Sequence, residues 1–123
     1  MQLAFADSEL GGAALEGGNL RIRFAAAAVE QGPGGEAGYL LGLDLELLDA
    51  TVDGDLRDAF GRVLQGELSD GVSRLARIEL PFEGPGAWRL DLELAQGRKL
   101  SVAAKHVRAV PAAGAVFRAS FAC

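Results

Sequence analysis

Apolar and polar residues alternate along most of the chain with a period of two. The alternation is clearest in LRIRF (20–24), YLLGLDLEL (39–47), ARIEL (76–80) and AWRLDLELA (87–95). Successive side chains of a β-strand point to opposite faces of a sheet, so this period is typical of strands that bury one face. Glycine-rich segments between them, such as EGGN, EQGPGGEAG and EGPG, indicate turns. The pattern therefore predicts a chain built almost entirely of strands.

One segment, GDLRDAFGRVLQGEL (54–68), also has apolar residues at helical spacing. These residues are Leu56, Phe60, Val63 and Leu64, with Asp53 as a candidate N-cap. Gly61 and Gly66 interrupt the segment, and glycine is unfavourable inside a helix because its backbone loses the most conformational freedom. We therefore expect at most one short helical turn near 55–60 and assign the remainder to strand.

Short strands that alternate with turn signals are typical of all-β folds. We expect one all-β domain over residues 1–123, an antiparallel sandwich or a small barrel of about eight or nine strands. Residues 14–29 and 94–109 resemble each other weakly, because in both a glycine turn leads into an alternating strand and then into alanines. This similarity raises the hypothesis of an internal duplication.

Two of the predicted strands change the face that their apolar residues occupy. The apolar residues of 20–24 share one parity and Val29 has the other, while those of 100–104 differ in parity from Val107. A shift by one residue moves every later side chain to the opposite face, so we expect a β-bulge at the alanines of each strand. The alanine-rich strand 24–29 has few charges, and we expect it to protect a sheet edge poorly.

Charge and parity together predict the register of the first two alternating strands. Only an odd sum of paired residue numbers lets both leucine faces and both charged faces agree. With such a sum Arg23 faces Asp44. Arg21 then faces Glu46, and the two strands form a hairpin across the loop at 30–38.

A second hairpin is predicted to turn near Gly97. Pairing Leu94 with Leu100 keeps the leucines of both strands on one face of the sheet. The same register places Trp88 opposite His106, where the indole and the imidazole would pack against each other at the rim of the core.

Composition fits a single globular domain. The chain has 123 residues, of which 50% are hydrophobic, 24% are charged and only 7% are aromatic. Because alanine and glycine bury little area, the core must depend on leucines and on a few large side chains. The expected anchors are Phe5, Phe24, Tyr39, Phe60, Phe82, Trp88, Phe117 and Phe121.

Charge and cysteine content narrow the expected environment. The net charge of -5 opposes a polyanionic partner, so we expect no nucleic-acid binding. The first residues, MQLAFADSEL, lack the basic and long apolar regions of a secretory signal, and we expect no membrane association. Cys123 has no partner for an internal disulfide, which fits a reducing compartment. We therefore expect a cytoplasmic protein.

Two motifs lack the context that their chemistry needs. Residues 49–60, DATVDGDLRDAF, resemble a calcium loop, but Phe60 stands where a bidentate glutamate is required, so we predict no calcium binding. GPGGEA (32–37) has the glycine spacing of a dinucleotide fingerprint, but the strand after it offers no helix N-terminus to a phosphate. We expect neither a metal nor a cofactor.

Residues that carry acid–base chemistry are few or dispersed. His106 is the single histidine, and no further histidine or cysteine stands nearby to complete a metal site. Four carboxylates alternate with leucines along the strands: Asp44, Glu46, Asp91 and Glu93. We interpret them as solvated faces with cross-strand ion pairs. We therefore assign no catalytic residue, and keep His106, Trp88 and Lys105 as candidates for a ligand or interface role.

Gly86-Ala87-Trp88 resembles the glycine-x-tryptophan motif of lipocalins, which are eight-stranded barrels that carry ligands. The resemblance covers three residues, and these lie past the middle of the chain, whereas in lipocalins the motif is on the first strand. It implies a barrel carrier of a small apolar ligand as an alternative function. The sequence favours a non-catalytic β-module for protein interaction or self-association, as a homodimer joined along strand edges or faces. An uncharacterised enzyme is the second alternative.

Overall fold

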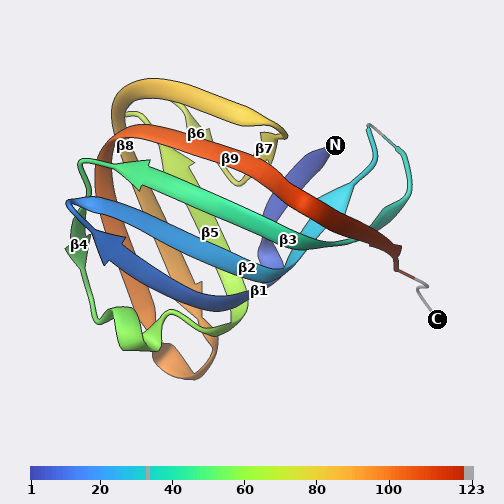
Figure 1. The fold of residues 1–123 in the computed structure, drawn as a ribbon, viewed down its shortest axis with the longest axis horizontal. Helices are drawn as coiled ribbons and strands as arrows, with labels where there is room; N and C mark the ends of the chain where they lie inside the picture. The colour runs from blue at the N-terminus through green and yellow to red at the C-terminus, as the bar shows by residue number, and fades with distance from the viewer. Residues whose placement is uncertain (33, 121–123) are drawn as a thin grey trace.

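The computed structural model describes residues 1–32 and 34–120, and it consists almost entirely of antiparallel strands (Figure 1). The anchor Phe121 and the cysteine Cys123 lie outside the described residues. The strands are β1 (Gln2–Glu16), β2 (Asn19–Glu30), β3 (Ala37–Leu48), β4 (Thr51–Asp53), β5 (Gly61–Ser69), β6 (Arg74–Leu75), β7 (Arg77–Glu79), β8 (Phe82–Leu94) and β9 (Lys99–Ala119). Two 3-10 turns complete the described part, η1 (Leu56–Asp58) and η2 (Ala95–Gly97). The all-β prediction is confirmed.

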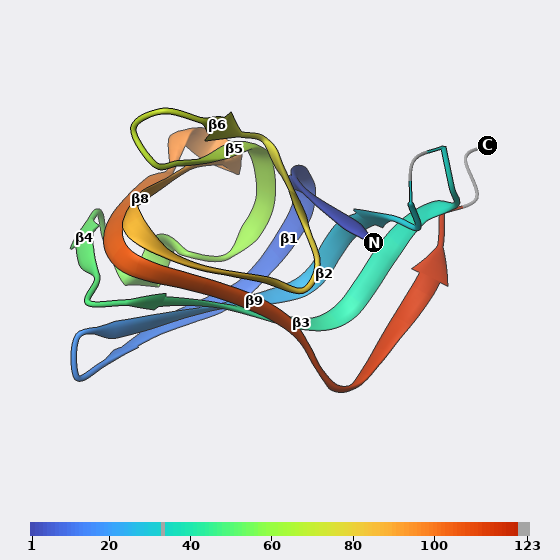
Figure 2. The ribbon, with the colours of Figure 1, turned by 90° about the horizontal axis from the view of Figure 1, so that it is seen from above.

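The sheet closes on itself. Six strands follow one another in the order β5-β8-β9-β3-β2-β1, and β1 returns to β5 through the pairs Glu9–Arg62 and Leu10–Gly61. Figure 2 shows this ring. The short strands β4, β6 and β7 are added at its margins. Of the two architectures expected from the sequence, the structure is the small barrel, and closure leaves most strands with partners on both sides. In the described residues, neither 3-10 turn has the length and apolar content that a membrane-crossing helix needs.

The barrel interior is filled by the apolar positions of the alternating strands. Phe5 and Phe24 are fully buried there, together with a layer of leucines, isoleucines and valines. Gly66 is needed beside them because a Cβ at this position would lie 2.6 Å from the Cβ of Phe5. Phe60 differs from the expectation for an anchor. Its ring is 52% exposed and the guanidinium of Arg98 covers it at 4.2 Å.

Both parity changes predicted from the sequence are present. In β2 Phe24 and Ala27 are both buried, although their positions differ by three and so have opposite parity. The neighbouring strand β3 changes face at the same level, where Gly42 has a φ of 104° and lets the backbone turn. In β9 the buried residues Ala104 and Val107 differ in parity, and β8 carries the matching irregularity between Pro85 and Trp88.

The register predicted for the β2–β3 hairpin is confirmed. Arg21 pairs with Glu46, and Arg23 pairs with Asp44. The guanidinium of Arg23 lies 3.4 Å from the Asp44 carboxylate, and that of Arg21 lies 3.9 Å from Glu46. Both pairs stand on the outer face, where solvent screens them, so they specify the register more than they stabilise the fold.

The register predicted for the β8–β9 hairpin is wrong by two residues. Leu92, not Leu94, pairs with Leu100, so Trp88 lies opposite Ala104 and not opposite His106. The prediction kept the correct face but assumed a loop that is too long. The actual loop has three residues (95–97), because Gln96 adopts a left-handed conformation with a φ of 68° and allows a tighter turn.

The helical turn predicted near 55–60 is present as η1. Its cap is Asp55, whose carboxylate accepts the backbone N–H of Arg57 at 2.9 Å, and not Asp53. Asp53 is the last residue of β4 and pairs with Ser101 of β9, which removes it from the turn. The sequence after η1 forms β5, as the glycine interruptions indicated.

The alanine-rich strand 24–29 is not an edge. It belongs to β2, which pairs with β1 on one side and with β3 on the other. The structure therefore overturns the idea that this strand is where a second chain approaches. Small side chains here serve the tight packing of three adjacent strands, and any open edge must be sought elsewhere in the sheet.

Candidate functional site

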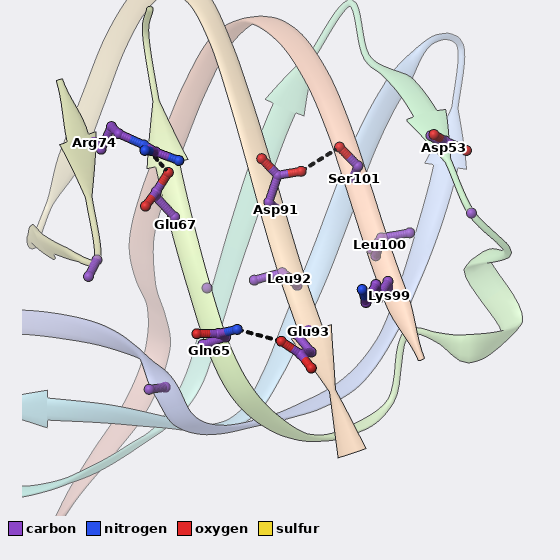
Figure 3. Close-up of a pocket in the computed structure, with 14 residues that line it drawn as sticks. Asp53, Gln65, Glu67, Arg74, Asp91, Leu92, Glu93, Lys99, Leu100 and Ser101 are labelled. Atoms are coloured by element: carbon purple, nitrogen blue, oxygen red, sulfur yellow. Dashed lines mark hydrogen bonds and ion pairs between the residues drawn. The ribbon is translucent and has the colours of Figure 1, made fainter. Parts of the chain in front are cut away.

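A groove of about 730 Å³ lies across the outer face of β5, β8, β9 and β4 (Figure 3). The strand registers place Glu67, Asp91, Ser101 and Asp53 side by side across its width. Backbone from Gly66 and a few apolar side chains complete its lining. Outward-facing positions of regular strands thus supply its polar side chains.

The polar groups of this groove bind one another. Figure 3 shows Arg74 donating to Glu67 at 2.8 Å, and Gln65 donating to Glu93. The hydroxyl of Ser101 donates to Asp91 at 2.7 Å. Because these partners already engage Glu67, Asp91 and Glu93, the groove resembles a solvated face more than a prepared ligand site. Asp91 and Glu93 thus stand on an outer face, as interpreted from the sequence, but their cross-strand partners are a serine and a glutamine and not the expected cations.

Metal ligation finds no support in the described residues. Histidine, cysteine and carboxylate side chains do not gather there in groups of three or more. Asp53 of the calcium-like segment lies in β4, paired with β9, and Asp55 is engaged as the cap of η1. The absence of calcium binding remains a prediction.

The candidates His106, Trp88 and Lys105 lie where β8 and β9 pair, but they do not converge on one point. The imidazole Nε2 of His106 lies 3.1 Å from the Glu83 carboxylate, and its side chain is 29% exposed. The Trp88 indole donates to the backbone carbonyl of Gly84 at 3.0 Å. Lys105 points to solvent.

Trp88 belongs to a small aromatic cluster at the margin of the core. Its ring meets that of Phe82 edge to face, with 5.6 Å between the ring centroids. Both rings are half-buried and pack against the core. These contacts give Trp88 a structural role that the sequence also indicated, although its partner is Phe82 and not His106.

The last residues of β9 form a strand with one free side. Residues 116–119 pair with β3 from Leu41 to Gly38, and no strand of the described chain pairs with their other side. Figure 2 shows β9 bending sharply before it reaches this segment, and the register shift between residues 111 and 116 marks the same bend. We call the unpaired side of Val116–Ala119 the β9 edge.

Backbone polar groups along the β9 edge can be assigned from the ladder. The N–H of Ser120 donates to the carbonyl of Ala37 at 2.9 Å. Ser120 and Ala37 therefore form a hydrogen-bonded pair, and the backbone groups of Ser120 face β3. Antiparallel ladders alternate, and Arg118 and Val116 therefore also turn their N–H and C=O groups toward β3. Phe117 and Ala119 turn theirs outward, to the free side.

The side chains of the β9 edge are mainly apolar. Val116 is 50% exposed, and Phe117 is half-buried over Gly38, at which a Cβ would lie 2.8 Å from the phenyl ring. Residues 109–117 carry no charge, and Arg118 follows them. Phe117 was expected as an anchor, whereas Val116 was not singled out. The uncharged run was the signal in the sequence that could have identified this edge.

Comparison of the chain with protein-family models, with curated proteins and with solved structures found no match.

Proposed function

We propose that this protein is a β-module that self-associates by pairing strands at the β9 edge. The observation that carries the proposal is the backbone of Phe117 and Ala119, whose N–H and C=O groups face away from β3, on a side where residues 1–32 and 34–120 supply no strand. Such unpaired groups form a template for a strand from another chain.

The β9 edge lacks the devices that usually prevent such pairing. Charged side chains, above all lysines, commonly protect an edge strand, but here the charge is confined to Arg118. Pro111 and Gly114, at the bend before the edge, limit the regular segment to its last few residues. Pairing would accordingly be short and local, which suits reversible association.

Packing favours self-association over the alternative of an apolar-ligand carrier. Leucines, valines and phenylalanines fill the barrel interior, while the large groove is lined by carboxylates, Arg74 and Lys99. Native mass spectrometry of the purified protein separates the two functions. Self-association gives a doubled subunit mass, and a carrier gives an adduct of small mass on a single subunit.

A reducing cytoplasmic location is part of this proposal, because the chain has one cysteine.

Sedimentation velocity over a range of protein concentrations tests the proposal. Two variants should remain monomeric where the wild type associates. Ala119→Pro removes an N–H that faces outward and that β3 does not use, and Val116→Lys places a charge on the edge. Val72→Lys is the matched control, since Val72 is 92% exposed on a distant turn and should associate like the wild type.

Two results would contradict the proposal. A wild type that stays monomeric at every concentration would remove self-association as the function. Association that survives in both Ala119→Pro and Val116→Lys would place the contact on another surface. Circular dichroism of each variant must match that of the wild type, so that loss of association is not mistaken for loss of fold.

A further inference from the structure

We infer that two copies of the chain pair their β9 edges antiparallel about a two-fold axis at Phe117, which closes the assembly at two subunits. The inference rests on the proposed function and specifies its partner and geometry. It follows from the direction of the backbone groups, the position of Arg118 and the charges at the opposite margin of the sheet.

Backbone direction restricts the register. In an antiparallel pair, outward-facing residues of one strand exchange hydrogen bonds with outward-facing residues of the other. Phe117 and Ala119 are the outward-facing residues that the ladder with β3 assigns. Any axis that passes through a residue sets outward-facing residues opposite one another, so backbone direction leaves axes at Val116, Phe117 and Arg118.

Charge excludes the neighbouring register that would move the axis to Arg118. The two Arg118 side chains would then stand directly opposite each other, and like charges in that position destabilise a strand pair. With the axis at Phe117, Arg118 of each copy faces Val116 of the other. An axis at Val116 would instead set Ala119 against residue 113, within the bend of β9.

Phe117 also fits a two-fold contact through its side chain. Its ring lies on the face of the sheet that packs on the core, and it is half-buried in the single subunit. Pairing across the axis would bring the two rings together and cover the area that each leaves exposed. Aromatic cross-strand pairs of this kind add to the stability of a sheet.

The other margin of the same sheet disfavours an open chain of subunits. There the outermost strand is β7, where Arg77 pairs with Glu30 at 3.4 Å and Glu79 binds the amino group of Met1 at 3.1 Å. A head-to-tail filament would need the β9 edge to join this charged strand. At the level of the β9 edge the strands run β9-β3-β2-β1-β7, so joining two β9 edges leaves a charged β7 strand at each end of this stretch, which disfavours further growth there.

Disulfide trapping tests the register. Val116→Cys and Arg118→Cys are prepared separately in a Cys123→Ser background, mixed in equal amounts and oxidised. With the axis at Phe117, positions 116 and 118 form a non-hydrogen-bonded pair, in which the Cα atoms lie about 4.5 Å apart, within reach of a disulfide. The mixed disulfide, identified by its mass, should exceed either like-with-like product by on the order of tenfold, because only the axis at Phe117 sets position 116 of one copy opposite position 118 of the other.

Each outcome has a distinct meaning. Excess Val116→Cys homodimer would move the axis to Val116, and excess Arg118→Cys homodimer would move it to Arg118. Either result overturns the inferred register while self-association still stands. A third outcome is that the wild type sediments as a dimer, but the disulfide products are no more abundant than those of a Val72→Cys control. That result would place the dimer contact away from this edge. A monomeric wild type would instead end the proposed function itself.

Discussion

Ser8 shows how a single polar side chain can hold a strand irregularity inside a core. It is fully buried on β1, beside Asp7, whose φ of 68° interrupts the strand. Its hydroxyl donates to the carbonyl of Ala4 at 2.8 Å and accepts the N–H of Ala28 at 2.9 Å. One hydroxyl therefore replaces the ladder bonds that the irregularity removes.

Replacing Ser8 with alanine should lower the free energy of unfolding by about 1 kcal/mol, the low end for an unsatisfied group, because two partly buried backbone groups lose their partner. Urea denaturation measures the loss. Ser73→Ala is the matched control, since the Ser73 side chain is exposed and only its backbone groups bind Asp70. Equal midpoints for the two variants would show that water satisfies Ala4 and Ala28 equally well.

Trp88 and His106 are expected to differ in their contributions to stability. Trp88→Ala removes a ring that packs on Phe82 and on the core, and should cost about 3 kcal/mol, at the low end for such truncations because the ring is half-buried. His106→Gln keeps a donor for Glu83 and should cost no more than about 1 kcal/mol. Denaturation midpoints and sedimentation of both variants check this. Loss of association at unchanged stability in His106→Gln would give the histidine a direct role.

At the scale of elements, the η1 turn depends on the charge of its cap. The side chain of Arg57 donates to the Asp55 carboxylate, as does the Arg57 backbone, and these bonds lower the pKa of Asp55. A carboxyl whose pKa is lower in the folded state contributes stability above its unfolded pKa of about 3.9, and this contribution is lost as the pH falls through the folded pKa. The pKa of Asp70 is also lowered, because the carboxylate accepts the backbone N–H groups of Ser73 and Val72.

Replacing Arg57 with methionine should raise the pKa of Asp55 toward its ordinary value, because the largest of the interactions that lower it is removed. A carboxyl-detected NMR titration measures the pKa directly. Asp70 serves as the internal reference, and its pKa should not move. An unchanged pKa for Asp55 would mean that the backbone bond alone sets it.

Elements whose side chains alternate strictly could be predicted closely from the sequence. The β2–β3 register followed from parity and from the charges of Arg23 and Asp44, because both faces of each strand carried information. The β8–β9 register did not, since the leucine faces agree equally well with a three-residue or a five-residue loop. What decided between them was the left-handed conformation of Gln96, and glutamine gives no signal for that conformation.

At the scale of the whole molecule, the closure of the sheet determines what the surface can do. The sequence could indicate a small all-β fold but not which strands would become neighbours, because pairing between distant strands leaves no local pattern. For that reason the sequence predicted that the alanine-rich strand 24–29 would lie at an edge of the sheet, whereas β2 lies between β1 and β3. Within the part of the chain that the structure describes, the end of β9 has β3 as its one partner strand, and we propose self-association at that edge.

Amide hydrogen exchange at two protein concentrations, followed by NMR, tests this claim most directly. The N–H of Arg118 faces β3, so its exchange should be equally slow at both concentrations. The N–H of Phe117 faces the free side and should exchange rapidly in dilute solution but slowly at high concentration, where a second β9 edge accepts it. Exchange of Phe117 that is rapid and identical at both concentrations would contradict self-association through the β9 edge.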